Sequence, residues 1–430
     1  MKRIRGKSGL QGEVTVPGDK SITHRAVILA SLSEGKSQIS GYLSSEDCER
    51  TITAFRQMGV AISSELFQGS RRLTIEGGGL WGLTEPRGII DCGNSGTTMR
   101  LLCGLLSGQS FFSVLTGDES LLKRPMRRVV DPLRMMGAEI SGRADGGLAP
   151  LAISGKRLSS IDYKLPIPSA QVKSAILLGG LTASGRTMIE EPRPSRDHTE
   201  RMFQHFGVHF EKKGEVLSVV GGHPFRACEI DVPGDISSAA FFLVAGIIMD
   251  GSDLCIRKVG VNPSRTGLID VLQKMGADIC IKPLKSVSHE PIADFRVRSS
   301  RLKGILIEGE MATKMLDEFP ILCIAAAAAE GKTVFRGAEE LRYKESDRIE
   351  MMAAALRGMG IDVETFQDGM EICGKKEWTG TACRTGGDHR IAMAMAVAGL
   401  MAEGGNAIDN TDCINTSFPG FFDLLSALKS

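Results

Sequence analysis

The sequence has almost no net charge, no long apolar run and no paired cysteine motif. Its 52 basic and 51 acidic side chains leave a net charge of +1, so it lacks the broad basic face of a nucleic-acid-binding protein. The longest apolar run covers residues 239–249 and is shorter than the about 20 residues that a membrane-spanning helix needs. These absences exclude a nucleic-acid partner and a membrane anchor from our expectations.

The cysteines and the start of the chain both favour a protein that is not exported. None of the ten cysteines forms a C-x-x-C pair, and a chain of 430 residues does not need disulfides as a short secreted domain does. The basic N-terminus turns polar within a few residues, which does not suit a secretory signal. We therefore expect a cytoplasmic protein with reduced thiols.

Nucleotide-binding motifs are also missing. No G-x-G-x-x-G follows an expected strand, which disfavours the alternative of a doubly wound, Rossmann-like protein. Residues 12–21 resemble a P-loop, but five residues instead of four separate Gly12 from Gly18, and Asp19 precedes Lys20. Because a carboxylate there would repel the phosphate that a P-loop holds, the sequence disfavours a nucleoside triphosphatase.

What the sequence does contain is one pattern repeated about every 70 residues. A polar cap opens an apolar helix, a strand follows, and an amphipathic helix then ends at a glycine before another strand. The glycines expected to end these second helices in a left-handed conformation are Gly59, Gly137, Gly207, Gly276 and Gly360. The first helices are expected to start near Ser21, Asn94, Ser169, Ser237, Glu318 and His389. Being apolar on nearly every face, they must be buried.

Six such units in 430 residues predict two domains of three units each, with the helices inside and the sheets outside. We place the N-terminal domain at residues 18–234 and the C-terminal domain at residues 1–17 and 235–430, completed by the N-terminal strand. The tetrapeptide Val-Pro-Gly-Asp occurs at both 16–19 and 232–235. We interpret both copies as hinge strands between the domains.

Polar residues cluster at the N-terminal ends of the buried helices, where free N–H groups and the helix dipole favour anions. They are Lys20, Ser21 and Arg25 in the first unit, residues 94–98 in the second, Ser169 and Gln171 in the third, Asp317 in the fifth and residues 388–390 in the sixth. If the helices of each domain point toward the other domain, these residues converge on one cleft. The sequence therefore predicts an interdomain site for small, highly anionic substrates.

Two further basic segments cover residues 123–128 and 344–348. Either could be a solvated helix start, which is where most such charge runs lie. In the second segment, helical spacing would place Lys344 and Arg348 on one face with Glu345 beside them. A carboxylate between two cations suits proton transfer near a phosphate.

Nine segments together resemble the 5-enolpyruvylshikimate-3-phosphate synthase family along essentially the whole chain. They are PGDKSITHRA, GNSGTTMR, GDESLLKRPMRRV, PSAQVKSAILL, SRDHTERM, LDEFP, YKESDR, GGDHRIAMA and TSFPGF. The resemblance implies an α/β fold of two inside-out barrels with three βαβαββ-like units per domain. It also implies transfer of enolpyruvyl from phosphoenolpyruvate to the 5-hydroxyl of shikimate 3-phosphate, with release of phosphate, in the shikimate pathway to chorismate and aromatic amino acids.

The resemblance also assigns residues, residue by residue. Those implied to hold shikimate 3-phosphate are Lys20, Ser21, Arg25, Ser169, Ala170, Gln171, Arg196, Asp317 and Lys344. Those implied to hold phosphoenolpyruvate are Lys20, Gly96, Arg124, Gln171, Arg348 and Arg390. For catalysis we assign Asp317 as base, Glu345 as acid and Lys20 as the shared cation, with Asp47, Asn94 and His389 as helpers; His389 could equally be a structural helix-start residue. No metal or organic cofactor is implied, and we expect a monomer.

Several positions depart from the family pattern. Gly96 stands where the subgroup that tolerates the inhibitor glyphosate usually has Ala, so we expect inhibition by glyphosate and its relief by Gly96→Ala. Glu340 and Thr416 replace Asn and Lys of other members. Two alternatives remain: the sister enzyme that acts on UDP-N-acetylglucosamine, and a non-catalytic anion-binding homologue. The first uses a loop cysteine that residues 117–128 lack, and the second should have lost the reactive groups that are present here.

Overall fold

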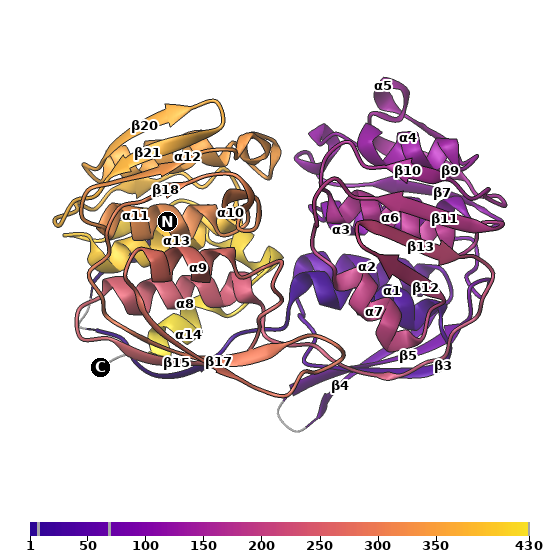
Figure 1. Ribbon diagram of the computed structural model, residues 1–430, viewed down its shortest axis with the longest axis horizontal. Helices are drawn as coiled ribbons and strands as arrows, with labels where there is room; N and C mark the ends of the chain where they lie inside the picture. The colour runs from indigo at the N-terminus through magenta and orange to yellow at the C-terminus, as the bar shows by residue number, and fades with distance from the viewer. Residues whose placement is uncertain (7–8, 68–69, 429–430) are drawn as a thin grey trace. The chain divides into compact units, whose positions relative to one another are not determined.

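The computed structural model describes residues 1–6, 9–67 and 70–428 (Figure 1). The chain divides into two compact units. We call Gly18–Val232 with Ser286–Glu290 the N-terminal unit, and Met1–Pro17, Pro233–Lys285 and Pro291–Ser430 the C-terminal unit. The chain passes between the units directly after Pro17 and after Val232, inside the two Val-Pro-Gly-Asp copies.

The N-terminal unit contains three four-stranded sheets among its described residues. Their strand orders are β14 (Glu229–Asp231), β3 (Glu34–Ser40), β5 (Ser70–Gly78), β4 (Ala61–Phe67); β6 (Ile90–Asp91), β7 (Phe112–Thr116), β9 (Leu148–Ser154), β8 (Glu139–Gly142); and β10 (Asp162–Lys164), β11 (Arg186–Glu190), β13 (Val216–Val220), β12 (Phe210–Lys213). Each sheet begins with one parallel pair and continues with two antiparallel pairs. The repeat expected from the sequence therefore recurs in strand order and direction.

The C-terminal unit repeats this pattern with one shorter sheet. Its strand orders are β16 (Asp278–Pro283), β17 (Ile292–Arg298), β15 (Asp253–Gly260), β2 (Gln11–Thr15); β18 (Leu306–Ile307), β19 (Lys332–Phe335), β21 (Gly369–Cys373), β20 (Asp362–Phe366); and β1 (Lys2–Ile4), β23 (Asn406–Ile408), β22 (Ala382–Cys383). β2 pairs in parallel with β15, and β1 pairs antiparallel with β23. The first strands of the chain thus complete sheets built mainly from its second half.

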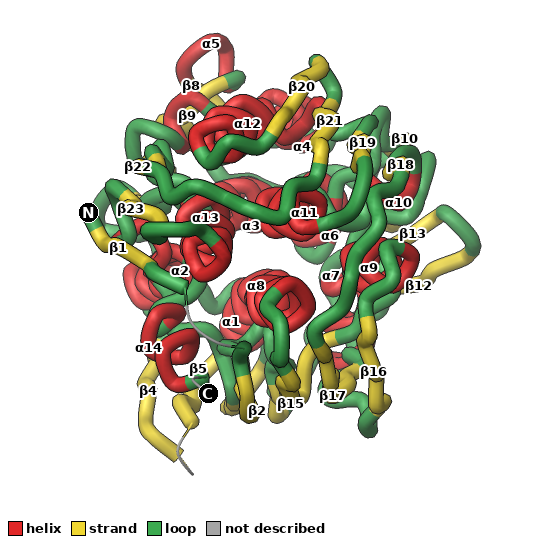
Figure 2. The backbone as a smooth tube through the Cα atoms, turned by 90° about the vertical axis from the view of Figure 1, so that its left-hand side faces the viewer, coloured by secondary structure: helices red, strands yellow, loops and turns green. Residues whose placement is uncertain are grey.

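The first helix of every repeat lies in a hydrophobic core. These helices are α1 (Lys20–Leu32), α3 (Gly96–Ser107), α6 (Ala170–Gly180), α8 (Ile236–Ile248), α11 (Phe319–Ala328) and α13 (His389–Met401). In the C-terminal unit, α8, α11 and α13 pack on one another while β2, β15, β20 and β21 lie at the periphery (Figure 2). All thirteen residues of α8 are buried. This arrangement is the two-domain inside-out α/β fold expected from the resemblance.

The second helices bury one face and leave the other partly or fully exposed. They are α2 (Glu46–Gln57), α4 (Arg127–Met135), α7 (His198–Phe206), α9 (Gly267–Lys274) and α12 (Arg348–Gly358), with α14 (Phe421–Ala427) at the end of the chain. Shorter segments are α5 (Arg143–Gly146), α10 (Glu310–Thr313) and the 3-10 helices η1 (Leu121–Lys123), η2 (Glu339–Tyr343) and η3 (Asp412–Thr416).

The predicted helix boundaries are confirmed. Each first helix starts within two residues of its expected position. All five glycines expected to end second helices have positive φ, between 68° at Gly207 and 102° at Gly276. Because a Cβ disfavours that conformation, glycine lets the chain turn directly from helix to strand.

Two properties concern the chain as a whole. All ten cysteines carry free thiols. Within residues 1–6, 9–67 and 70–428, no helix has the length and apolar character to cross a membrane.

His24 on α1 gives a testable link between burial and stability. Its ring is fully buried, with Nδ1 2.7 Å from Oγ1 of Thr51. Burial lowers the pKa of His24 to about 3, and Lys20 and Arg25 act in the same direction. The unfolded chain, with a histidine pKa of about 6.5, therefore binds one more proton between these values. Above pH about 6.5 the neutral ring does not lower the free energy of unfolding. Below that pH, His24 lowers the free energy of unfolding by about 1.4 kcal/mol per pH unit as the pH drops toward 3.

His24→Gln should remove this contribution to the slope. Urea denaturation at two pH values, about 6.5 and about 4.5, measures it as the difference between natural protein and variant. His209→Gln, at an exposed position, is the matched control and should keep the natural slope. Equal slopes for the natural protein and His24→Gln would contradict a neutral buried ring.

Candidate active site

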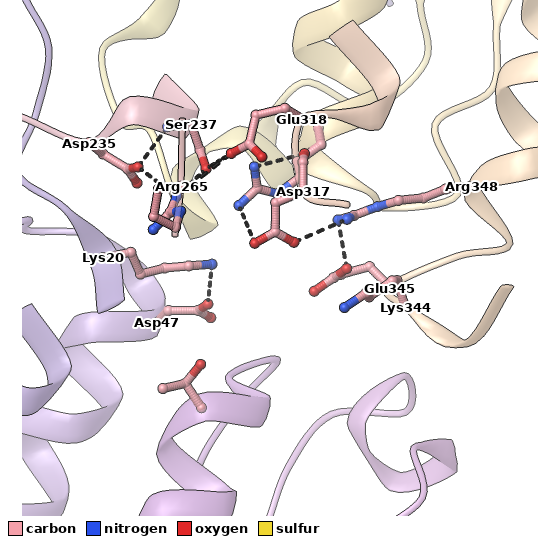
Figure 3. A network of polar contacts seen from close by, with 12 residues as sticks. Lys20, Asp47, Asp235, Ser237, Arg265, Asp317, Glu318, Lys344, Glu345 and Arg348 are labelled. Atoms are coloured by element: carbon pink, nitrogen blue, oxygen red, sulfur yellow. Dashed lines mark hydrogen bonds and ion pairs between the residues drawn. The ribbon is translucent and has the colours of Figure 1, made fainter. Parts of the chain in front are cut away.

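In the N-terminal unit, α1 and α2 bring a lysine and a carboxylate together. Nζ of Lys20 lies 2.9 Å from Oδ2 of Asp47, and the two side chains are 16% and 8% exposed (Figure 3). Asp19 caps α1 by accepting the backbone N–H of Ile22 at 2.9 Å. The first turn of α1 therefore presents Lys20 and Ser21 at a helix N-terminus, where anions are favoured.

Arg25, one turn further along α1, is almost fully buried. Its Nε donates to Oγ1 of Thr199 at 2.7 Å and its Nη2 to Oγ of Ser174 at 2.8 Å. Nη1 donates to the backbone oxygen of Ser21 at 3.0 Å. The guanidinium is thus held in one orientation by α6 and α7.

The start of α3 carries the second group of predicted residues. Nη2 of Arg124 donates to Oδ1 of Asn94 at 2.7 Å, while Nδ2 of Asn94 donates to Oδ2 of Asp118 at 2.7 Å. Arg124 is 8% exposed, whereas Lys123 is exposed. Within the basic segment at 123–128, Arg124 is therefore buried and bonded to Asn94, whereas Lys123 lies on the surface.

Gly96 is the first residue of α3, beside two guanidinium groups. A Cβ at this position would lie 3.0 Å from Nη1 of Arg100 and 3.4 Å from Nη1 of Arg124. The contact with Arg100 is closer than ordinary van der Waals distance, so an added Cβ requires the end of that side chain to move by a few tenths of an ångström, whereas the contact with Arg124 is at the edge of the ordinary range. The glycine thus keeps the helix N-terminus open between these cations.

The third group lies at the start of α6. Ser169 caps this helix by accepting the N–H of Val172 at 3.4 Å, and Ala170 and Gln171 form its first turn. Oε1 of Gln171 accepts from Nη1 of Arg100 at 2.6 Å, and its Nε2 donates to Oγ1 of Thr97 at 3.0 Å. These bonds fix the amide orientation of Gln171 and join α6 to α3.

Arg196 lies in the segment before α7 and is partly exposed. It is near enough to Arg25 that its charge contributes to lowering the pKa of Arg25. The structure therefore places two guanidinium groups, from α1 and from the segment before α7, in one region of the N-terminal unit.

In the C-terminal unit, two arginines and three carboxylates form a second cluster, of which Figure 3 labels Asp317, Glu345 and Arg348. Oδ1 of Asp317 lies 3.6 Å from Nη1 of Arg348, and Oδ2 of Asp317 lies 3.8 Å from Nη2 of Arg390. Nη2 of Arg348 donates to Oε2 of Glu345 at 2.7 Å. Asp317 and Glu345, the expected base and acid, thus both contact Arg348.

Arg348 is the centre of this cluster and is 1% exposed. Its Nε donates to Oδ2 of Asp388 at 2.8 Å. Burial disfavours its charged form, but the carboxylates of Asp388, Glu345 and Asp317 outweigh this effect and hold the pKa of Arg348 above its usual value. The guanidinium therefore stays charged inside the protein.

The expected helical spacing of Lys344 and Arg348 is wrong. Lys344 is extended, with ψ of −151°, and α12 begins only at Arg348. The reason is Asp347, whose side chain caps α12 by accepting the N–H groups of Ile349 and Glu350 at 3.1 Å each. Lys344 instead lies 3.4 Å from Glu340, one of the positions that departs from the family pattern.

His389 is the first residue of α13 and is buried, while Asp388 caps the helix by accepting the N–H of Arg390 at 2.9 Å. Nη1 of Arg390 donates to the backbone oxygen of Asp317 at 3.0 Å. The start of α13 therefore contacts the start of α11 through Arg390.

Four further residues form a buried network next to Asp317 (Figure 3). Nη2 of Arg265 donates to Oγ of Ser237 at 2.6 Å and lies 3.4 Å from Asp235 and 3.6 Å from Glu318. The hydroxyl of Ser237 donates to Glu318. This network joins the starts of α8 and α11, and so fixes the backbone that carries Asp317.

Sequence reasoning gave Arg100 and Arg265 no role in the site, and it named Asp388 only as part of the polar residues 388–390 without a role of its own. Arg100 ends the segment GNSGTTMR, whereas Arg265 precedes α9 with no motif around it, and their partners are 71 and at most 53 positions away. Asp388 precedes His389 and Arg390 in GGDHR, so the signal was present, but only the structure shows that its carboxylate holds Arg348.

Comparison with known proteins agrees with this geometry. The family model described as EPSP synthase (3-phosphoshikimate 1-carboxyvinyltransferase) matches residues 4–425. The chain is 53% identical to the 3-phosphoshikimate 1-carboxyvinyltransferase of Pelobacter propionicus, covering 98% of this chain and 97% of that protein. It is 54% identical to the protein of that name from Geobacter sulfurreducens, covering 97% and 96%.

Solved structures show the same relationship. An EPSP synthase structure from Acinetobacter baumannii has a TM-score of 0.88 and 46% identity, covering 99% of this chain and 97% of that one. The enolpyruvyl transferase NikO from Streptomyces tendae has a TM-score of 0.80 at 18% identity, covering 99% and 96%, and supports the fold alone. Fold and matches together define the class: a transferase with the two-domain inside-out α/β architecture. Within this class, the chain belongs to the EPSP synthase family.

Proposed function

We propose that this chain transfers the enolpyruvyl group of phosphoenolpyruvate to the 5-hydroxyl of shikimate 3-phosphate and releases phosphate. The observation that carries the proposal is the cluster in which Asp317 and Glu345 both contact buried Arg348. A guanidinium that stays charged can bind the anionic substrate, and two carboxylates beside it can move protons at the reacting atoms. The family match and the names of the relatives support the same reaction.

We assign the proton transfers as follows. Asp317 takes the proton from the 5-hydroxyl, whose oxygen attacks C2 of phosphoenolpyruvate, and Glu345 protonates the methylene carbon C3. The bond between C2 and the phosphate oxygen then breaks, the leaving phosphate takes the hydroxyl proton back from Asp317, and a proton leaves the methyl carbon to restore the double bond. Glu345, deprotonated in the first step, is the group that can accept this proton.

The remaining residues bind substrate in this proposal. Arg124, Arg348, Arg390 and Lys20 bind phosphoenolpyruvate, with Gly96 and Gln171 beside it. Lys20, Ser21, Arg25, Ser169, Ala170, Gln171, Arg196 and Lys344 bind shikimate 3-phosphate. Asp47, Asn94 and His389 are assigned to orient Lys20, Arg124 and the start of α13. No metal or organic cofactor takes part in the proposed reaction.

These residues come from both units, so we propose that both units contribute residues to substrate binding. Since one chain supplies both sets, we also propose that it acts as a monomer. Ten free thiols are consistent with a reducing compartment, and we propose the cytoplasm.

A coupled phosphate-release assay tests the function. We expect phosphate only when both shikimate 3-phosphate and phosphoenolpyruvate are present. Release from either substrate alone, at a rate equal to that with both, would identify a phosphatase and refute the proposal.

Gly96→Ala tests the phosphoenolpyruvate site. Glyphosate is longer than phosphoenolpyruvate, and the resemblance implies that it occupies the same place. A methyl group 3.0 Å from Arg100 should crowd the longer molecule more, at a cost of about 1–3 kcal/mol. We expect the inhibition constant of glyphosate to rise about ten- to hundredfold, with a smaller change in KM for phosphoenolpyruvate. An insensitive natural protein whose inhibition does not change in Gly96→Ala would contradict this account.

A further inference from the structure

Lys173 forms a buried charge cluster that the proposed chemistry does not use. It lies on α6, two residues after Gln171, and is fully buried. Its Nζ lies 2.9 Å from Oε2 of Glu191 and 2.6 Å from Oε1 of Glu200, which are each about 4% exposed. Buried charges are costly unless they are paired, so one lysine between two carboxylates ties three chain segments together.

Glu191 connects this cluster to the segment that carries Arg196. Its second oxygen, Oε1, accepts both the N–H of Ser195 at 3.2 Å and the hydroxyl of Ser195 at 2.5 Å. The segment from 191 to 195 therefore closes on itself immediately before Arg196. With Glu191 held by Lys173, the start of this segment is fixed to α6.

Glu200 connects the cluster to Arg25. Thr199, its neighbour on α7, accepts from Nε of Arg25 at 2.7 Å. Ser174, the neighbour of Lys173 on α6, accepts from Nη2 of Arg25 at 2.8 Å, and the two hydroxyl oxygens are 2.6 Å apart. Burial lowers the pKa of Arg25 to about 10, and Glu200 is the largest influence in the opposite direction.

We propose that Lys173, Glu191 and Glu200 are positioning residues for the shikimate 3-phosphate subsite. The cluster sets the places of Arg25 and Arg196, the two guanidinium groups that are proposed to hold that substrate. This inference rests on the proposed function. None of the hydrogen bonds described above joins the cluster to Arg124, Arg348 or Arg390, the arginines proposed to bind phosphoenolpyruvate. Loss of the cluster should therefore weaken binding of shikimate 3-phosphate selectively.

Glu191→Gln tests the proposal, since it keeps the size of the side chain and removes its charge. We expect KM for shikimate 3-phosphate to rise about tenfold or more, because misplacing a substrate-binding group by about 1 Å has a large effect. KM for phosphoenolpyruvate and kcat should stay within about twofold. Calorimetric titration with shikimate 3-phosphate alone should show the same loss of affinity.

Glu190→Gln is the matched control. Glu190 is the adjacent residue, but it pairs with Lys164 at 2.5 Å on the surface, where the two side chains are 68% (Lys164) and 44% (Glu190) exposed. This variant should keep both KM values. If Glu191→Gln does not fold, Ser195→Ala tests the proposal instead. This variant removes only the hydrogen bond from the partly exposed hydroxyl of Ser195 to Glu191 and should raise KM for shikimate 3-phosphate.

The outcomes separate this inference from the proposed function. A natural protein without phosphate release in the presence of both substrates refutes the function itself. An active natural protein with an unchanged KM for shikimate 3-phosphate in Glu191→Gln, or in Ser195→Ala when the first variant is unfolded, refutes only the positioning role. Equal increases in both KM values would show general loosening and would also refute it.

Discussion

Asp317→Ala is expected to lower kcat by about 10²–10⁴-fold, the usual contribution of a positioned general base. Affinity for shikimate 3-phosphate should change far less, because a base acts mainly in the transition state. Asp317 is 19% exposed and lies 3.6 Å from Arg348 and 3.8 Å from Arg390, the two arginines that are proposed to bind phosphoenolpyruvate.

Steady-state rates and calorimetric binding of shikimate 3-phosphate measure the two effects separately. Asp270→Ala, on the exposed side of α9, is the control and should match the natural protein. If binding and turnover fall in proportion, Asp317 is a binding residue and the assignment of the base is wrong.

Asp388→Ala should lower the free energy of unfolding by about 3–5 kcal/mol, the cost of leaving a buried charge without its partner. The carboxylate of Asp388 is fully buried, lies 2.8 Å from Nε of Arg348, and caps α13 through the N–H of Arg390. The same variant should raise KM for phosphoenolpyruvate, since both arginines are proposed to bind it.

Urea denaturation and steady-state kinetics at one pH measure both parts of this prediction. Asp278→Ala is the control, because Asp278 pairs with Arg298 at 3.5 Å on the surface, where both side chains are about half exposed. Such a pair contributes about 0–1 kcal/mol. Similar losses in the two variants would mean that burial of the pair of Asp388 and Arg348 has no special effect.

Local signals in the sequence predicted the positions of the helices well. Polar caps such as Ser169 and Asp388, and the glycines after each second helix, act within a few residues, so the sequence displays them directly. All five glycines have positive φ, and each first helix starts within two residues of its expected position. The repeat also predicted that the first helices are buried.

Long-range partners could not be predicted in the same way. That Arg100 orients Gln171 depends on how two repeats pack, and that Lys173 pairs with both Glu191 and Glu200 depends on how α6 packs with α7 and the segment before it within one repeat. Even a local inference failed where two signals competed: helical spacing suggested a shared face for Lys344 and Arg348, but the cap formed by Asp347 starts the helix later. The roles of the site residues therefore remain predictions that the variants above test one by one.

The proposed reaction is tested most directly by following the phosphorus atoms of one reaction mixture by ³¹P NMR. With both substrates and the purified chain, we expect the phosphoenolpyruvate signal to decrease and inorganic phosphate to appear in equal amount. The signal of shikimate 3-phosphate should be replaced by that of a product that keeps its phosphate and carries the enolpyruvyl ether. Inorganic phosphate that forms while the signal of shikimate 3-phosphate stays unchanged would contradict the proposed transfer.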